Sequence, residues 1–426
     1  MPFDLAAQPW WSAGLAALVL PVLLFAGGRR DMLAYLAAYF LLFGFGPVVS
    51  HLLGGTIYFG TNTLLIGRAA LGLLLAFAGV AAAGLLLRQR RDIRDPIQQL
   101  ETGRRMPLVP AVLALLALYA LGVLAWGGPA FLAGNKLDRI AVAGPFHYDY
   151  LLLEMCACAL YFIAQESSTG RFAYRVNLGA YIAYCLATGE RDFVFVLFAL
   201  VLHRELVRTE RRLPRSVLWG AGLLLGATAL FALRGSGSPG GADAGAILNQ
   251  GSVLFVDTWV MGHVPSTEPY MHGASYLHAL VNLIPGQHRA PLAQWLVDRY
   301  APGSDSGYGF SLTGEAYANF GLAGIPALFA LLTAVHRWLV NRVDRAPVYA
   351  YASILFTVAW MYGFRGESQS LLKTVVYGAV FFGVIRMISA RGHDSARAHE
   401  SARAHDSDRA RDSARADDEE AACVSS

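Results

Sequence analysis

Charged residues are scarce in this chain. Of its 426 residues, 15% are Asp, Glu, Lys or Arg, whereas 55% are hydrophobic. A soluble protein of this length would carry more charge and shorter apolar runs. Long apolar stretches recur between Trp10 and Ile388, and many approach the roughly 20 residues that a helix needs to cross a bilayer. Because a backbone in lipid must satisfy its own hydrogen bonds, the sequence predicts an all-α polytopic membrane protein.

Patterns that bind metals or form disulfides are also missing. Cys156, Cys158 and Cys185 fall inside apolar stretches and Cys423 lies near the C-terminus, so no pair suggests a disulfide framework or a zinc site. Four histidines share the stretch 263–288, but their spacing matches no metal-binding helix motif. We therefore expect neither a metal nor a cofactor. The first apolar stretch has no basic region before it and no cleavage signal after it, so we expect a retained span.

The apolar stretches predict about eleven membrane spans. They cover residues 10–27, 32–50, 64–87, 107–126, 146–165, 172–189, 192–207, 216–233, 319–340, 347–364 and 369–389. Cytoplasmic connections are enriched in Lys and Arg, and all but nine of the 34 basic residues fall on one side of this arrangement. The nine are Arg68, Lys136, Arg139, Arg191, Arg234, Arg289, Arg299, Arg365 and Lys373. The N-terminus is therefore predicted outside and the C-terminus in the cytoplasm.

One external connection is much longer than the others. It covers about 85 residues, 234–318, whereas ordinary connections are far shorter. Residues 275–284 and 290–300 within it are predicted to form short amphipathic helices that lie against the membrane. Residues 1–390 thus form the expected transmembrane domain. Residues 391–426 have almost no large apolar side chains, which predicts a disordered cytoplasmic tail.

Arginines occur where a membrane protein should least retain them. Arg191, Arg234 and Arg365 each lie within two positions of a glycine, at the outer end of an apolar stretch. Charge is expensive at this depth, and a planar guanidinium binds phosphate oxygens through paired hydrogen bonds. The set predicts an anionic ligand at the outer face, with Lys373 as a fourth cation. Alternatively, Arg191 only caps a turn through its acidic neighbours, and Lys373 pairs with Glu367.

Aromatic and small polar residues alternate in two phrases of the long loop, at residues 270–277 and 306–321. A sugar ring stacks its apolar face on aromatic side chains, while its hydroxyls need donors and acceptors. The candidates for sugar binding are Tyr270, Tyr276, Tyr308, Tyr317 and Asn319. Alternatively, the aromatic residues anchor the loop at the level of the lipid headgroups, where Tyr and Trp are enriched.

These two segments are similar to a known protein family. The run Gly-Glu-Ala-Tyr-Ala-Asn-Phe-Gly at 314–321, preceded by Gly-Tyr-Gly and by Gly-Ala-Ser-Tyr-Leu at 273–277, resembles the Wzy-type O-antigen and oligosaccharide repeat-unit polymerases. The hairpin Thr-Gly-Glu-Arg-Asp at 188–192 and the Arg-Gly-Glu at 365–367 look similar to that family. The topology of roughly residues 30–390 fits as well. One departure is that Arg289 follows Pro285 at a distance, whereas many relatives place an arginine directly after this proline.

The resemblance implies a bacterial inner- or plasma-membrane glycosyltransferase of the GT-C class, a helical bundle with one large external loop. Such enzymes polymerise oligosaccharide repeat units carried on undecaprenyl diphosphate, without a metal. By matching motif, the diphosphate-binding role would fall on Arg191, Arg234 and Arg365, with Arg289 as a further candidate. The loop roles would fall on His272 and Glu315. Expected partners are the lipid-linked glycans, the bilayer, a flippase and a chain-length regulator, and no nucleic acid.

The reaction also needs a base for the acceptor hydroxyl. The candidates are His272, Glu315 and Asp257, and an ordinary imidazole titrates near neutrality, which favours His272. The alternative is that His272 and Glu315 only hold the loop together by hydrogen bonds.

Three rival functions share parts of this pattern. A ligase of the same class would move finished glycan to another acceptor. A transporter or flippase of lipid-linked saccharides would also need cations near the diphosphate, but we find no internal repeat of the kind that transporters show. A non-enzymatic partner in envelope assembly would not need the arginine set.

Overall fold

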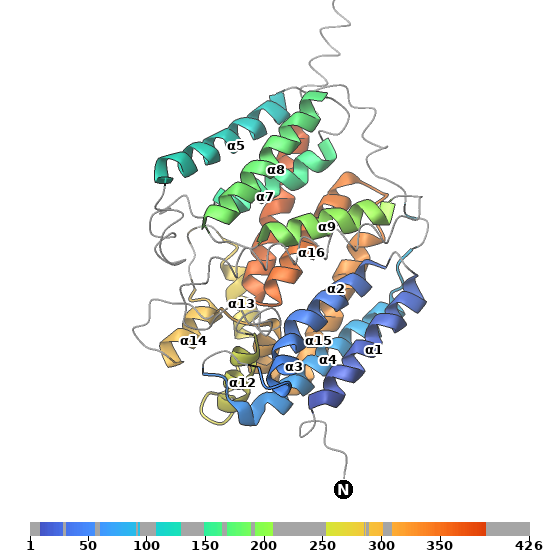
Figure 1. Ribbon diagram of the computed structural model, residues 1–426, viewed down its shortest axis with the longest axis vertical. Coiled ribbons are helices and arrows are strands. Elements are labelled where there is room, and N and C mark those ends of the chain that lie inside the picture. Colours follow the sequence, from blue (N-terminus) through green and yellow to red (C-terminus); the bar gives the residue numbers. More distant parts are fainter. Residues whose placement is uncertain are drawn as a thin grey trace, which may run out of the picture.

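The computed structural model describes residues 9–28, 31–55, 60–90, 93, 108–128, 149–163, 168–188, 192–207, 253–284, 286, 289–300 and 309–388. Every regular element in these ranges is a helix (Figure 1). The all-α class is therefore confirmed for this part of the chain. The predicted span 216–233 and the predicted tail 391–426 lie outside the described residues.

The helices follow the chain in this order: α1 (Pro9–Gly27), α2 (Met32–Phe40), the π-helical turn η1 (Leu41–Phe45), α3 (Gly46–Leu52), the 3₁₀ turn η2 (Thr63–Leu65), α4 (Ile66–Leu86), α5 (Leu108–Gly127), α7 (Asp149–Ile163), α8 (Ser168–Thr188), α9 (Asp192–Val207), α12 (Val253–His263), α13 (Ala274–Val281), α14 (Leu292–Tyr300), α15 (Leu312–Val340), α16 (Pro347–Gly363) and a last helix, Ser368–Ile388.

Each predicted span inside the described ranges coincides with a helix or with consecutive helical segments. Five helical stretches in the described part are long and apolar enough to cross a membrane. They are Pro9–Ala26, Met32–Leu52, Thr63–Leu86, Leu312–Val340 and Ser368–Ile388. The chain thus has the helices of a polytopic membrane protein, and the full set of eleven spans stays a prediction.

Two elements differ from the sequence prediction. The long loop contains α12, a helix too short to cross a bilayer, in which residues 253–261 are all buried. Helix α15 begins at Leu312 and not at 319, because the Ser311 side chain accepts a hydrogen bond from the Gly314 N–H and caps the helix. The predicted amphipathic segments do form helices, α13 and α14.

Helices α4 and α15 run side by side (Figure 1). Small residues allow the close approach, since a Cβ added at Gly79 would collide with the Pro326 carbonyl oxygen. Hydrogen bonds join the two helices at both ends, Arg68 to Tyr317 where they begin and Gln89 to Arg337 where they finish. The two helices are therefore parallel, and the molecule has two distinct ends.

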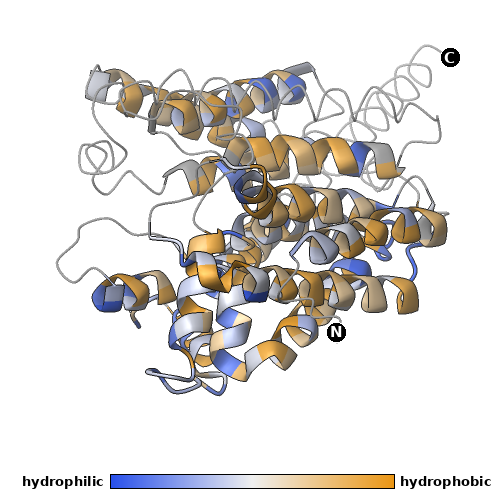
Figure 2. Ribbon diagram, turned by 60° about the horizontal axis from the view of Figure 1, so that its bottom comes forward, coloured by the Kyte–Doolittle hydropathy of each residue, from blue (hydrophilic) through white to orange (hydrophobic). Residues whose placement is uncertain are grey.

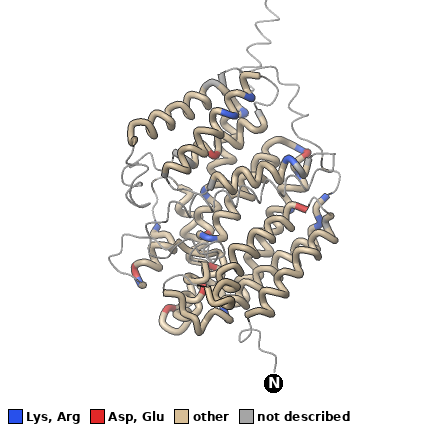
Figure 3. Tube along the Cα trace, viewed as in Figure 1, with Lys and Arg blue, Asp and Glu red and all other residues tan. Residues whose placement is uncertain are grey.

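The end at which α4 and α15 finish is held by a buried ion pair. An Arg337 amine donates to Asp31 Oδ2 over 2.6 Å, and both side chains are almost fully excluded from solvent. Gln89 Oε1 accepts from Arg337 and from the Met32 N–H, while Asp31 Oδ1 caps α2. Nearby, Arg90 pairs with Asp344. The predicted basic residues after α4 and in the last turn of α15 therefore do share one end. Figure 3 shows few charged positions along the bodies of the helices.

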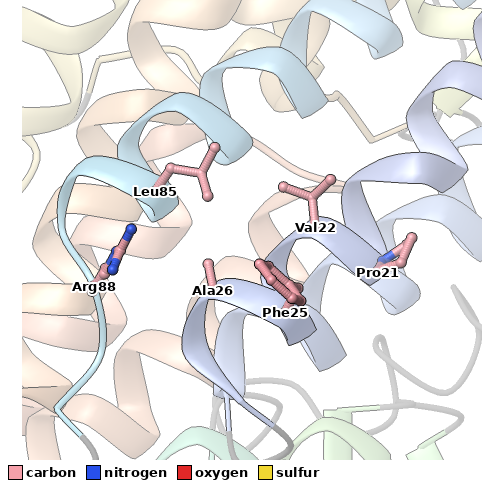
Figure 4. Close-up of a pocket in the computed structure, with 6 residues that line it drawn as sticks. All are labelled: Pro21, Val22, Phe25, Ala26, Leu85 and Arg88. Carbon is pink, nitrogen blue, oxygen red and sulfur yellow. The ribbon is translucent and has the colours of Figure 1, made fainter.

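The long helices are apolar along most of their length (Figure 2), and many of their large apolar side chains are exposed. Helix α1 exposes most of its large side chains, with Phe25 91% exposed. A shallow groove lies between α1 and the end of α4 (Figure 4), and its lining residues are Pro21, Val22, Phe25, Ala26, Leu85 and Arg88. Arg88 directly precedes Gln89, which bonds Arg337, so this groove belongs to the end that carries the ion pair.

We predict that Asp31→Asn lowers the free energy of unfolding by about 3–5 kcal/mol, because it leaves the Arg337 charge buried without its partner. Asparagine can still cap α2, which isolates the loss of charge. The measurement is chemical unfolding of the purified protein in detergent. Asp344→Asn is the control, since the Arg90–Asp344 pair is partly exposed and its loss should cost no more than about 1 kcal/mol. Equal effects of the two substitutions would contradict this account.

Candidate active site

Helix α15 is interrupted near its beginning, at Phe320 and Gly321. Gly321 has φ 64° and ψ −157°, a combination that is essentially restricted to glycine. The interruption frees two carbonyl groups, and the preceding loop uses both: Ala318 O accepts from the Met271 N–H at 2.9 Å, and Asn319 O accepts from the His272 N–H at 3.3 Å. The segment before α13 is thereby docked into the gap in α15.

Asn319 closes this junction with its side chain. Its Oδ1 accepts from the Gly273 N–H at 2.8 Å, and its Nδ2 donates to Ser275 Oγ and to the Glu315 carbonyl, each at 2.8 Å. The docked backbone is tightly turned, with φ 47° at His272 and 92° at Gly273. A non-glycine residue with positive φ is uncommon and needs support from its surroundings. Here the support comes from Asn319, and the His272 side chain is left exposed.

Glu315 lies one helical turn before Asn319, and its carboxylate joins three elements. Oε1 accepts from the Ser275 and Ser368 hydroxyls, and Oε2 accepts from the Ser368 N–H, each at 2.7 Å. The side chain is buried. Glu315 therefore ties α15 to α13 and to the start of the last helix.

Asp257 is buried on α12 and belongs to the same region. Its carboxylate accepts hydrogen bonds from Ser311 and from Thr313, the latter at 2.8 Å to each oxygen. Burial raises the pKa of Asp257 to about 6, although these hydrogen bonds oppose the shift. Because Ser311 caps α15, Asp257 fixes the helix start that carries Glu315.

Glu367 is the third buried carboxylate, in the connection between α16 and the last helix. Its Oε2 accepts from the Leu292 N–H at 2.6 Å, at the beginning of α14. Burial raises the pKa of Glu367 to about 7; the charge of Glu315 adds to the shift, and hydrogen bonds and Lys373 oppose it.

The cations predicted to bind diphosphate are only partly described. Arg365 is half-buried, with its guanidinium 5.8 Å from the centre of the Phe43 ring and its Nε without a hydrogen-bond partner in the described part. Arg289 is exposed, and its backbone N–H and carbonyl both bond the Asn282 side chain. Arg191 and Arg234 lie outside the described residues.

Arg68 lies at the same end of the bundle, although no sequence motif indicated it. This arginine lies in the first turn of α4 and donates to the Tyr317 hydroxyl at 2.6 Å. Tyr317 in turn lies beside Tyr270, with 6.3 Å between ring centres. The available signal was that Arg68 is a lone cation at the predicted outer end of an apolar stretch, the feature by which Arg365 was chosen.

The aromatic candidates divide into exposed and buried members. Tyr270 is half-buried, and so is Tyr276, which stacks at 6.3 Å on Phe320. Phe320 is 51% exposed although it is large and apolar. Tyr317 and Asn319 are buried, so they lie beneath the surface that a sugar could contact. Tyr308 falls outside the described residues.

His272, Asn319 and Glu315 belong to one hydrogen-bond network at the end where α4 and α15 begin. The hydrogen bonds run from His272 through Asn319 and Ser275 to Glu315, and then to Ser368. Gln369, next to Ser368, bonds Asn282, which holds Arg289. Within the described ranges, no three His, Cys, Asp or Glu side chains gather as metal ligands. The arrangement offers an exposed imidazole, cations, and aromatic rings around a rigid polar interior.

Comparison with known proteins identifies part of the chain. Residues 260–391 match the family model described as O-antigen polysaccharide polymerase Wzy. No curated protein and no solved structure matches the chain. The matched segment is about a third of the chain and contains the loop before α13, helices α13 to α16 and the last helix. The resemblance inferred from residues 273–277, 314–321 and 365–367 is therefore confirmed.

We predict that Gly321→Ala destabilises the protein by about 1–3 kcal/mol and reduces activity, because alanine strains this backbone conformation. The new Cβ would also lie 3.1 Å from the Tyr270 hydroxyl oxygen. Gly179→Ala in α8 is the control, since its Cβ would have no neighbour within 4 Å and its backbone is helical. Thermal unfolding in detergent reports the difference. Equal unfolding temperatures for the two variants would show that α15 needs no glycine at its interruption.

We predict that Glu367 makes the protein less stable as pH rises from about 4.5 to about 7. The folded state holds the Glu367 proton more tightly than the unfolded chain, whose pKa is near 4.5, so this contribution is complete below that value and is lost as pH passes the folded pKa. Glu367→Gln should flatten this part of the stability curve, because an amide keeps a hydrogen-bond acceptor for Leu292 without titrating. Unfolding temperatures at several pH values test this, and parallel curves would refute it.

Proposed function

We propose that this chain is a polysaccharide polymerase that joins oligosaccharide repeat units carried on undecaprenyl diphosphate at the external face of a bacterial inner or plasma membrane. The observation that carries the proposal is the match of residues 260–391 to the Wzy family, combined with the network that these residues form. The network end is the external one in this proposal. The N-terminus is then outside, and residues 391–426 form the cytoplasmic tail.

The reaction is a glycosyl transfer. A hydroxyl of the acceptor unit attacks the anomeric carbon of the donor sugar, the bond from that carbon to the diphosphate oxygen breaks, and the hydroxyl proton passes to a base. The leaving group carries the developing negative charge. Cations aimed at the leaving diphosphate therefore lower the barrier, since they stabilise the charge where it develops.

His272 is the base that the geometry favours. Its imidazole is exposed, whereas the Glu315 and Asp257 carboxylates are buried and accept several hydrogen bonds each. A base must reach the acceptor hydroxyl, and two buried carboxylates held by serine and threonine cannot do so without breaking the junction. Glu315 and Asp257 then act by position: they hold α12, α13 and α15 so that His272 keeps its turned backbone.

We assign the leaving diphosphate to Arg365, with Arg191, Arg234, Lys373 and Arg289 as further cations. The unpaired Nε of Arg365 supports this assignment, because a half-buried guanidinium with an unused donor suits an oxyanion. Tyr270 and Tyr276 offer rings for the sugars, and Phe320 extends the surface beside Tyr276. No metal enters this scheme.

We predict that Arg191→Ala, Arg234→Ala and Arg365→Ala each abolish long polymer while the protein stays inserted in the membrane. The corresponding lysine variants should recover poorly, because a point charge does not reproduce the paired hydrogen bonds of a guanidinium. His272→Gln should also abolish polymer but leave the unfolding temperature unchanged, whereas Glu315→Gln should lower both. Gel analysis of surface polysaccharide measures chain length in cells that depend on this chain.

Arg342→Ala is the control, because Arg342 lies just after α15, at the opposite end. Wild-type chain length in all three alanine variants would reject the diphosphate assignment, and full activity of His272→Gln would reject the base. Variants that still make polymer on the lipid carrier but no longer attach it to its acceptor would favour a ligase. Lipid-linked units that never reach the outer face without this chain would favour a flippase.

A further inference from the structure

Arg68 is a cation whose position local structure does not explain. It lies in the first turn of α4, where the partial positive charge of the helix dipole disfavours a positive side chain. No carboxylate in the described part of the chain forms an ion pair with it. Arg299, at the same end, is instead neutralised by Glu268 at 2.7 Å. A cation kept at an unfavourable helix end without a counter-ion needs another reason to be there.

The Arg68 guanidinium is nonetheless held in place. One of its amines donates to the Tyr317 hydroxyl at 2.6 Å, and its Cζ lies 5.5 Å from the centre of the Tyr317 ring. Tyr317 is buried and immobilised within α15, so it is a rigid anchor. The other donors of the guanidinium have no acceptor in the described part of the chain. Arg68 is half-buried and thus oriented by protein on one side and accessible on the other.

Contacts through Gly44 connect α4 with the segment that carries Arg365. A Cβ added at Gly44 would lie 3.0 Å from both Leu73 of α4 and Phe364, the residue before Arg365. Arg68 precedes Leu73 by five residues, a rise of about 7.5 Å along the helix. Arg365 itself lies over the Phe43 ring, next to Gly44. Both arginines therefore lie at the end of the bundle that carries the network, Arg68 on α4 and Arg365 in the connection after α16.

We propose that Arg68, oriented by Tyr317, is a further ligand of the diphosphate group of the lipid-linked donor. This inference rests on the proposed function and extends its site beyond the matched segment, because Arg68 lies outside residues 260–391. A diphosphate offers oxygens on two phosphorus atoms, so cations on two sides hold it better than one. Arg68 and Arg365 supply those two sides. Tyr317 is a positioning residue, which explains why an aromatic candidate for sugar binding is buried.

The test is binding of farnesyl diphosphate to the purified full chain in detergent, with farnesol as the uncharged comparison. Arg68→Ala should weaken farnesyl diphosphate binding roughly ten-fold and leave farnesol binding unchanged, a loss typical of a charge-assisted contact. Arg68→Lys should recover only part of the affinity. Tyr317→Phe keeps the ring but removes the hydroxyl, so it should weaken binding less, roughly three-fold. Arg299→Ala removes one positive charge at the same end and should have no effect.

Several outcomes would overturn the inference. If Arg68→Ala or, should that variant unfold, Arg68→Lys binds farnesyl diphosphate as the wild type does while Arg365→Ala does not, Arg68 is no ligand and the proposed function stands. If the wild type does not distinguish farnesyl diphosphate from farnesol, the proposed function and the inference fail together. Equal losses in Arg68→Ala and Arg299→Ala would show a general effect of charge and would also reject a specific contact.

Discussion

The interruption of α15 at Phe320–Gly321 is the constraint on which the candidate site depends. An unbroken helix would use the Ala318 and Asn319 carbonyls internally, and the loop before α13 would have no partners for the Met271 and His272 N–H groups. Because the helix opens there, the loop docks and His272 takes its turned backbone. The exposed position of the His272 imidazole thus depends on the backbone conformation of Gly321 in α15. The Asn319 side chain connects the two, because it bonds the loop backbone at Gly273.

The two ends of the parallel pair α4 and α15 use polar residues differently. At one end, Asp31 and Arg337 neutralise each other and Gln89 completes the bonding, so the cluster is closed and structural. At the other end, Glu315 and Asp257 are satisfied by hydroxyls and backbone, while Arg365 keeps an unused donor. Because these carboxylates are held by neutral groups, Arg68 and Arg365 have no counter-ion in the described part of the chain. An anion from outside can then complete them, which is the electrostatic basis of the proposed site.

The sequence predicted the elements better than it predicted their interactions. The length of the apolar stretches predicted the long helices, because a helix that crosses a bilayer needs a long run of apolar residues. The same criterion missed α12, which is buried but too short to cross a bilayer. It also began the α15 span at 319, because residues 312–318 include polar and aromatic side chains. Motif resemblance located His272, Glu315 and Arg365. Arg68 was missed because its partner, Tyr317, is 249 positions away, and no local pattern connects them.

The side chains of the motif at residues 314–321 differ in the neighbours that they contact. Glu315, Tyr317 and Asn319 alternate along the first turns of α15, so their side chains point to different neighbours. Glu315 and Asn319, one turn apart, share the face toward Ser275, while Tyr317 faces Arg68 on α4. In the proposed site, the motif therefore supports two sides from beneath: one face positions His272, the proposed base, and the other positions Arg68. In this proposal, substrate contacts fall to the residues that this framework leaves exposed, His272 and Phe320 above all.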